Sequence, residues 1–94
     1  MAVYIVTWNF NKEKPNYAKA RADFLKVLDG YATIRDRDLE SVRFFSTSQT
    51  AQQLANSLHT PLDNNDALFV SWLRPSEYSG WLHSDIWKWI EPKL

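Results

Sequence analysis

The residue of this sequence best placed to do chemistry follows its first apolar stretch. Residues 2–8 are Ala-Val-Tyr-Ile-Val-Thr-Trp, without charge or breaker, and Asn9 comes directly after them. Such a run predicts a strand buried on both faces, and a short polar side chain at the end of a buried strand often belongs to a functional site. An amide oxygen can ligate Mg²⁺ or Ca²⁺, but it brings no negative charge. Asn9 is therefore the candidate catalytic residue, and the alternative is a turn-forming role.

Other polar side chains could join Asn9 in a cluster. Asn11 follows it closely, and Ser46 and Thr47 end a second predicted strand, where their hydroxyls could face a phosphate. The alternative for Ser46 and Thr47 is a polar segment leading into a capped helix, because Thr50 and Gln53 form a capping-box pattern.

Four basic residues are the candidates for binding a nucleic-acid backbone: Lys12, Lys14, Arg43 and Arg74. The alternative is that these side chains are simply solvated, as most scattered basic residues are. The whole chain has eleven basic and eleven acidic residues, so no overall field favours nucleic acid or an anionic membrane.

Several kinds of catalytic site are excluded by residue type. The chain has no cysteine, which removes disulfides, thiolate metal sites and cysteine nucleophiles. The two histidines, His59 and His83, lie far apart in the sequence, and neither has a second histidine at ligand spacing. We predict structural or surface roles for both. The sequence also contains no glycine-rich phosphate loop and no nucleophile elbow.

The elements that must position these residues follow from periodicity. Asn16 is a predicted N-cap for a helix that ends near Gly30, and residues 32–40 form a charged connector. Residues 41–46 predict a strand, residues 50–60 a short amphipathic helix, and residues 67–73 a second apolar strand. In the tail, Trp81-Leu82 predicts a short edge strand, and Ser84 or Asp85 caps a last helical turn that ends at Pro92.

This order predicts an α+β fold over the single domain 1–94. We expect a ferredoxin-like β-α-β-α-β arrangement followed by a short strand or helical tail, with two helices on one face of an antiparallel sheet. The two apolar strands are expected to be central neighbours, and the more polar strand at 41–46 is expected at an edge. One sheet face then stays open.

The aromatic content suggests self-association. The chain has five Trp, four Tyr and five Phe, more ring surface than a domain of this size readily hides. The open sheet face and the late tryptophans predict a homodimer interface that includes Trp72, Trp81, Trp87 and Trp89. Neither a signal peptide nor a transmembrane run is present in the sequence, so we expect no membrane partner and a cytoplasmic location.

Several segments together resemble a known group of proteins. They are residues 3–11, residues 14–17, Ser46-Thr47, residues 50–54, residues 65–70 and Gly80-Trp81-Leu82. In these segments the chain resembles small bacterial and phage proteins described as SinR-family or Cas2-like, related in outline to CRISPR-associated Cas2 proteins and VapD-type toxins. The resemblance covers most of the chain and consists of strand and turn patterns more than catalytic signatures.

The resemblance implies a ferredoxin-like homodimer with sheet packed against sheet. It also implies a site at the end of the first strand, where Cas2 proteins carry an acidic residue that holds a divalent cation with its copy in the partner. Asn9 stands at that position here, which counts against catalysis.

Three functions follow as hypotheses. The first is a Cas2-like dimeric binding or adaptor protein, non-catalytic and in contact with nucleic acid or a protein partner, without a cofactor. The second is a metal-dependent endoribonuclease of the Cas2 or VapD type, with Asn9, Ser46 and Thr47 around Mg²⁺. The third is a regulatory module for a small ligand.

Overall fold

The chain forms a ferredoxin-like α+β domain, seen in a computed structural model that describes residues 2–10 and 15–94. The elements follow one another as β1 (Ala2–Asn9), α1 (Tyr17–Leu28), β2 (Ala32–Ile34), β3 (Val42–Thr47), α2 (Ala51–His59), β4 (Ala67–Trp72), α3 (Ser84–Ile90) and a 3-10 turn (Glu91–Lys93). The strands pair in the order β2-β3-β1-β4, and every pairing is antiparallel. The predicted fold class is confirmed.

Strand β1 is the centre of the sheet because both of its faces are apolar. It pairs with β3 on one side and with β4 on the other. Val3 and Val6 are completely buried although they point to opposite faces of the sheet, as alternate strand positions do. The uninterrupted apolar run of the first strand is thus explained by burial on both sides.

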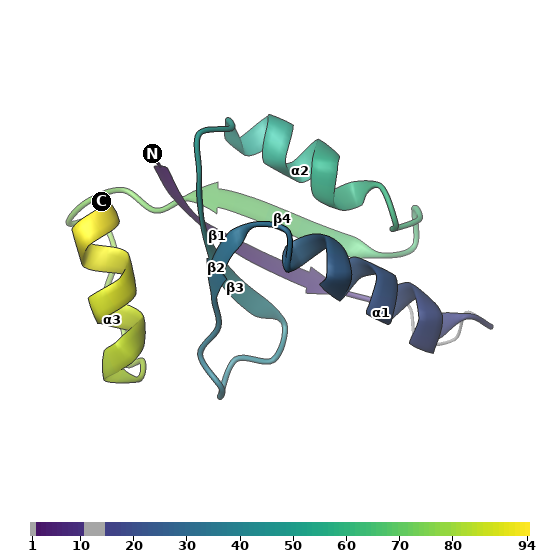
Figure 1. The fold of residues 1–94 in the computed structure, drawn as a ribbon, viewed down its shortest axis with the longest axis horizontal. Helices are drawn as coiled ribbons and strands as arrows, with labels where there is room; N and C mark the ends of the chain where they lie inside the picture. The colour runs from purple at the N-terminus through teal and green to yellow at the C-terminus, as the bar shows by residue number, and fades with distance from the viewer. Residues whose placement is uncertain (1, 11–14) are drawn as a thin grey trace.

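Helices α1 and α2 cover one face of the sheet, as predicted, and lie side by side in Figure 1. Phe24 and Leu28 of α1 and Leu54 and Leu58 of α2 are fully buried against the aromatic side chains of β1 and β3. The capping box predicted for α2 is present: Gln53 N donates to Thr50 Oγ1 over 3.1 Å, and Thr50 N donates to Gln53 Oε1 over 2.9 Å. Asn16 occupies the N-cap position of α1 without a side-chain capping bond.

The predicted positions of two strands are wrong. The apolar strand predicted at 67–73, β4, neighbours β1 as expected but lies at the edge of the sheet and not at its centre. Strand β3, predicted at 41–46 as an edge strand, is internal. The short strand β2 pairs with β3 on the side opposite to β1. Phe44 and Phe45 point to opposite faces, and both are buried, so β3 is apolar on both sides despite its polar neighbours. Strand β2 lies within the segment predicted as a charged connector, and its three residues are too few to show a period.

The second face of the sheet is not open, because α3 packs on part of it. Ile86 and Ile90 are fully buried against Val3 and Phe44 in a second core. The predicted edge strand at Trp81-Leu82 does not form, and His83, rather than Ser84 or Asp85, is the N-cap residue of α3. Figure 1 shows α3 standing apart from α1 and α2. Among the described residues, no helix has the length and apolar character needed to cross a membrane.

Candidate functional site

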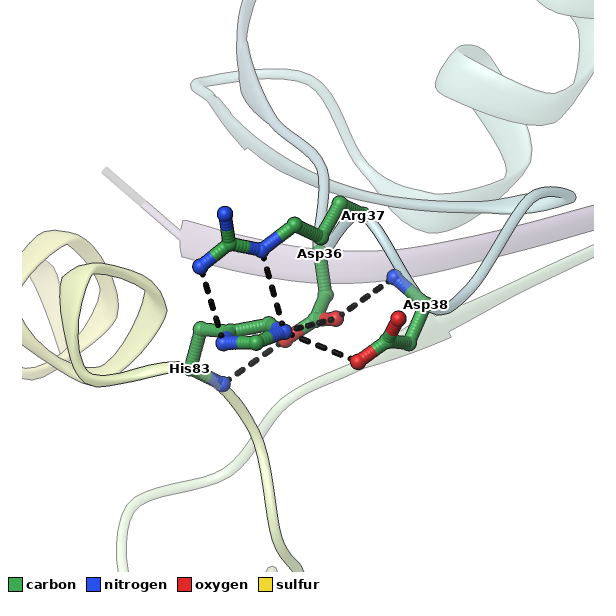
Figure 2. A network of polar contacts seen from close by, with 4 residues as sticks. All are labelled: Asp36, Arg37, Asp38 and His83. Atoms are coloured by element: carbon green, nitrogen blue, oxygen red, sulfur yellow. Dashed lines mark hydrogen bonds and ion pairs between the residues drawn. The ribbon is translucent and has the colours of Figure 1, made fainter.

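Two chain segments bring carboxylates and an imidazole together beside α3. Asp36 and Asp38 lie in the loop after β2, and His83 precedes α3, so nearly half the chain separates them in sequence (Figure 2). One donor atom from each of these three residues can be chosen so that all lie within 4.8 Å of one another. Together with Arg37, which lies against the imidazole, these residues are called the Asp–His cluster below.

Asp36 holds the loop and the start of α3 in place. Its Oδ1 accepts a hydrogen bond from Asp38 N over 2.9 Å, which closes a local turn, and its Oδ2 accepts one from His83 N over 2.8 Å. The residue is only 2% exposed. These backbone donors, with smaller contributions from the nearby His83 and Arg37, lower the pKa of Asp36 below its usual value. Asp36 is therefore an ionised, oriented carboxylate.

His83 is in contact with both carboxylates and with Arg37. Its Nε2 lies 2.8 Å from Asp38 Oδ2 and 3.7 Å from Asp36 Oδ1. The guanidinium of Arg37 places Nε 3.2 Å from His83 Nε2 and Nη2 3.2 Å from His83 Nδ1. Figure 2 shows Arg37 and the carboxylates converging on the ring.

A cavity of about 270 Å³ opens beside this cluster. It is lined by Asp36, Asp38, Leu39, Trp81, Leu82 and His83. Trp81 is 98% exposed, which is unusual for a tryptophan in a folded chain. A second cavity of about 190 Å³ adjoins it and is lined by Arg35, Asp36, Arg37, His83 and Asp85. His83 and Asp36 line both cavities, so the cluster can be reached by a ligand.

Two kinds of chemistry use such residues. An imidazole next to a carboxylate can accept and donate protons near neutral pH. Two carboxylate oxygens and one imidazole nitrogen are also a ligand set for a divalent transition metal. Among the described residues, no serine or threonine lines either cavity.

Asn9 lies elsewhere and is not joined by the other members of the predicted polar cluster. It lines a small cavity of about 100 Å³ together with Trp8, Phe10, Tyr17, Arg21, Glu40 and Ser41. Because β3 runs antiparallel to β1, Thr47 pairs with Ala2 and Ser46 with Val3. Six to seven residue steps at about 3.4 Å put Ser46 and Thr47 roughly 20–24 Å from Asn9 along the strand. Within one chain, these three residues do not form a site. Asn11 lies outside the described residues.

Of the four basic residues predicted to bind nucleic acid, the structure describes Arg43 and Arg74. The side chain of Arg43 is 15% exposed, and its Nη1 forms an ion pair with Asp29 Oδ1 over 2.8 Å. Arg74 is exposed, and its guanidinium lies 5.5 Å from the ring centroid of Trp72. Lys12 and Lys14 lie outside the described residues. Of this set, Arg74 is the one that the structure places on a free surface next to an aromatic ring.

The four tryptophans predicted at a dimer interface divide into two pairs. Trp72 and Trp81 are exposed at 53% and 98%. Trp87 is half-buried and stacks on Tyr78 with ring centroids 5.8 Å apart, and Trp89 packs against the second core. Trp87 and Trp89 thus have partners within their own chain, whereas Trp72 and Trp81 remain available to another molecule.

The Asp–His cluster was missed at the level of sequence, where the absence of a second histidine at ligand spacing was the reason to predict a structural or surface role for His83. Helix α3 folds back over the sheet and brings His83 to the loop after β2. The spacing Asp36-x-Asp38 was visible, but alternating charges around it are typical of a solvated loop. Only the fold shows that Asp36 is buried.

No protein-family model, curated protein or solved structure matches this chain.

Proposed function

We propose that this protein is a Cas2-like homodimeric binding module that contacts nucleic acid without cleaving it. The proposal takes the homodimer from the resemblance of the sequence but not its sheet-against-sheet packing, because α3 covers part of the second sheet face. It places the contact between the two chains at the exposed edge strand β4 instead. The ferredoxin-like topology agrees with the fold that the resemblance implies.

The edge strand β4 is the observation that carries the proposal. It pairs with β1 on one side and with no described strand on the other. Its sequence, Ala-Leu-Phe-Val-Ser-Trp, contains no charge and no proline. Natural proteins normally place charged residues or proline on an exposed edge strand, because the unpaired backbone groups of the edge otherwise pair with strands of other chains. Phe69 and Trp72, which are 62% and 53% exposed, add apolar side chains to this edge.

A second copy of the chain suits this edge. An antiparallel pair of identical strands is symmetric about a two-fold axis, so one surface serves both partners. Pairing β4 with its copy would satisfy the free backbone groups and bring the two Phe69 side chains close to the axis. The two sheets would then join into one continuous sheet that contains the four described strands of each chain.

The contact with nucleic acid is supported at the end of β4. Trp72 is exposed, and the Arg74 guanidinium lies over its ring. Lys93 and Trp72 line one cavity of about 190 Å³. Aromatic rings stack on bases and basic side chains neutralise phosphates, so this combination suits a single strand.

The non-catalytic part of the proposal depends on Asn9. Two carboxylates, one from each chain of a dimer, would hold a cation strongly. The two Asn9 side chains at that position are amides and bring no charge to a cation site. Ser46 and Thr47, the other residues of the nuclease hypothesis, lie at the opposite end of β1. Divalent-dependent cleavage of RNA or DNA that is lost in Asn9→Ala would contradict this part of the proposal.

Replacing Phe69 by lysine is expected to dissociate the dimer. The change puts two like charges near the two-fold axis, which costs several kcal/mol and raises the dimer Kd by about 100-fold or more. The measurement is sedimentation equilibrium at micromolar concentrations. Gln52→Lys, on the exposed surface of α2, is the matched control and should remain dimeric. A wild-type protein that is monomeric throughout this range would disprove the dimer.

Replacing Arg74 by alanine is expected to weaken binding to a labelled single strand. Loss of one phosphate contact should reduce the salt slope of log K by about 1, and Trp72→Ala should cost about 1–3 kcal/mol through lost stacking. Fluorescence anisotropy at several salt concentrations measures both effects. Arg21→Ala removes another exposed arginine, which lines the cavity beside Asn9, and should leave binding unchanged. Equal losses in the Arg74 and Arg21 variants would argue against this surface.

A further inference from the structure

We propose that Asp36, Asp38 and His83 form a binding site for a divalent first-row transition metal, with Arg37 as a built-in competitor of the metal. This site is separate from Asn9 and from β4, and it does not depend on the proposed function. It rests on the contacts around one atom, His83 Nε2.

Arg37 supplies a positive charge beside the three proposed ligands. Its Nε lies 3.2 Å from His83 Nε2 and its Nη2 lies 3.2 Å from His83 Nδ1, so the guanidinium lies against the imidazole ring. Asp38 Oδ2 approaches the same ring nitrogen, 2.8 Å from Nε2. The imidazole and the two carboxylates therefore gather at a point where positive charge is favoured.

A metal ion suits this set of donors. It accepts the lone pair of Nε2 and one electron pair from each carboxylate. The donor atoms are already close, with Nε2 2.8 Å from Asp38 Oδ2 and 3.7 Å from Asp36 Oδ1. Metal bonds of about 2.1 Å place neighbouring ligand atoms roughly 3 Å apart, so small side-chain shifts suffice. The cavity beside the cluster leaves room for water or another ligand on the metal.

The best-fixed member of the site is Asp36. Its carboxylate is buried and held by hydrogen bonds from Asp38 N and His83 N. Carboxylate oxygens have further lone pairs, so each oxygen can accept a backbone proton and still bind a cation. Hydrogen bonds of this kind to a ligand increase metal affinity because they orient it in advance.

The ligand types favour a transition metal over Mg²⁺ or Ca²⁺. Imidazole nitrogen suits Zn²⁺, Ni²⁺ or Co²⁺, whereas Mg²⁺ and Ca²⁺ prefer oxygen ligands alone. Arg37 opposes any cation, because its guanidinium contacts both ring nitrogens and brings a positive charge to two carboxylates. A metal must displace this side chain, which is exposed to solvent.

Calorimetric titration of the EDTA-treated protein with Zn²⁺ tests the proposal. We expect one Zn²⁺ per chain, with no comparable binding of Mg²⁺. His83→Ala and Asp38→Asn should each weaken binding about 10–100-fold. His59→Ala, which removes the other histidine of the chain, is the matched control and should bind like the wild type. Wild-type protein that binds no Zn²⁺ at 100 μM, or equal loss in the His83 and His59 variants, would overturn the proposal.

Arg37→Ala distinguishes a metal site from a structural hydrogen-bond cluster. Removing a positive charge within a few ångströms of the metal should tighten Zn²⁺ binding about tenfold. If Arg37 does not compete with the metal, Arg37→Ala would weaken Zn²⁺ binding or leave it unchanged, and this part of the proposal would be wrong. Co²⁺ gives a second readout, because its visible absorption should change on binding to wild type and remain that of free Co²⁺ with His83→Ala. Circular dichroism of each variant verifies that it is folded.

Discussion

Replacing Ile90 by alanine is expected to lower the free energy of unfolding by about 2–5 kcal/mol. Ile90 is fully buried in the second core, where α3 packs on Val3 and Phe44. Shortening the side chain leaves a cavity between the helix and the sheet. Because α3 has only seven residues, it depends on this packing more than on its own helix propensity. Urea unfolding followed by tryptophan fluorescence measures the loss.

The control for Ile90 lies on the same helix. Lys88 is exposed on α3, and Lys88→Ala should change the free energy of unfolding by less than about 0.5 kcal/mol. Similar stabilities of the Ile90 and Lys88 variants would show that α3 does not pack on the sheet in solution. The Asp–His cluster would then lose its support, because His83 directly precedes this helix.

Replacing Phe24 by alanine is expected to cost about 3–5 kcal/mol of the free energy of unfolding. Phe24 is fully buried under α1, and its ring meets Trp8 and Phe10 edge to face, with centroids 5.2 and 5.4 Å apart. The change removes both ring contacts and leaves a large cavity. A domain of this length has roughly 5–14 kcal/mol of stability in total, so this variant should be close to unfolding at 37 °C.

Thermal unfolding followed by circular dichroism measures the effect of Phe24→Ala. Lys26→Ala, which alters an exposed position on α1, is its control and should melt within a few degrees of the wild type. An unchanged melting temperature for Phe24→Ala would mean that α1 does not contribute to the core. Comparison with Ile90→Ala shows how stability divides between the two faces of the sheet.

The proposals depend on different parts of the molecule, so they can fail separately. The dimer rests on β4 and Phe69, nucleic-acid binding on Trp72 and Arg74, and the metal site on the Asp–His cluster. If the protein is a monomer that binds Zn²⁺, the dimer proposal is wrong and the metal-site proposal is retained.

Local pattern in the sequence was enough to predict most of the elements and the fold class. The apolar run 2–8 predicted the central strand because each face of a strand follows from alternate residues. The start of α2 followed from Thr50 and Gln53, because a capping box is complete within four residues. Helix α1 and the apolar strand at 67–73 were predicted for the same kind of reason.

Long-range pairing decided the rest. Strand β2 has three residues and exists because β3 offers it an edge, which no local period records. Strand β3 is internal because β2 pairs with its outer edge. The tail formed a helix, α3, where a last helical turn was predicted, and no strand at Trp81-Leu82; α3 packs on the second sheet face because that face had apolar surface to cover.

The Asp–His cluster also belongs to the tertiary structure alone. In the sequence, Asp36 is one charge among several in a polar connector, and His83 stands isolated from any ligand partner. The sequence determined which residues are present and which strands and helices they favour. Only the packing of α3 on the sheet decided that a buried carboxylate and an imidazole meet, because that contact joins segments distant in the chain and depends on the burial of Ile86 and Ile90.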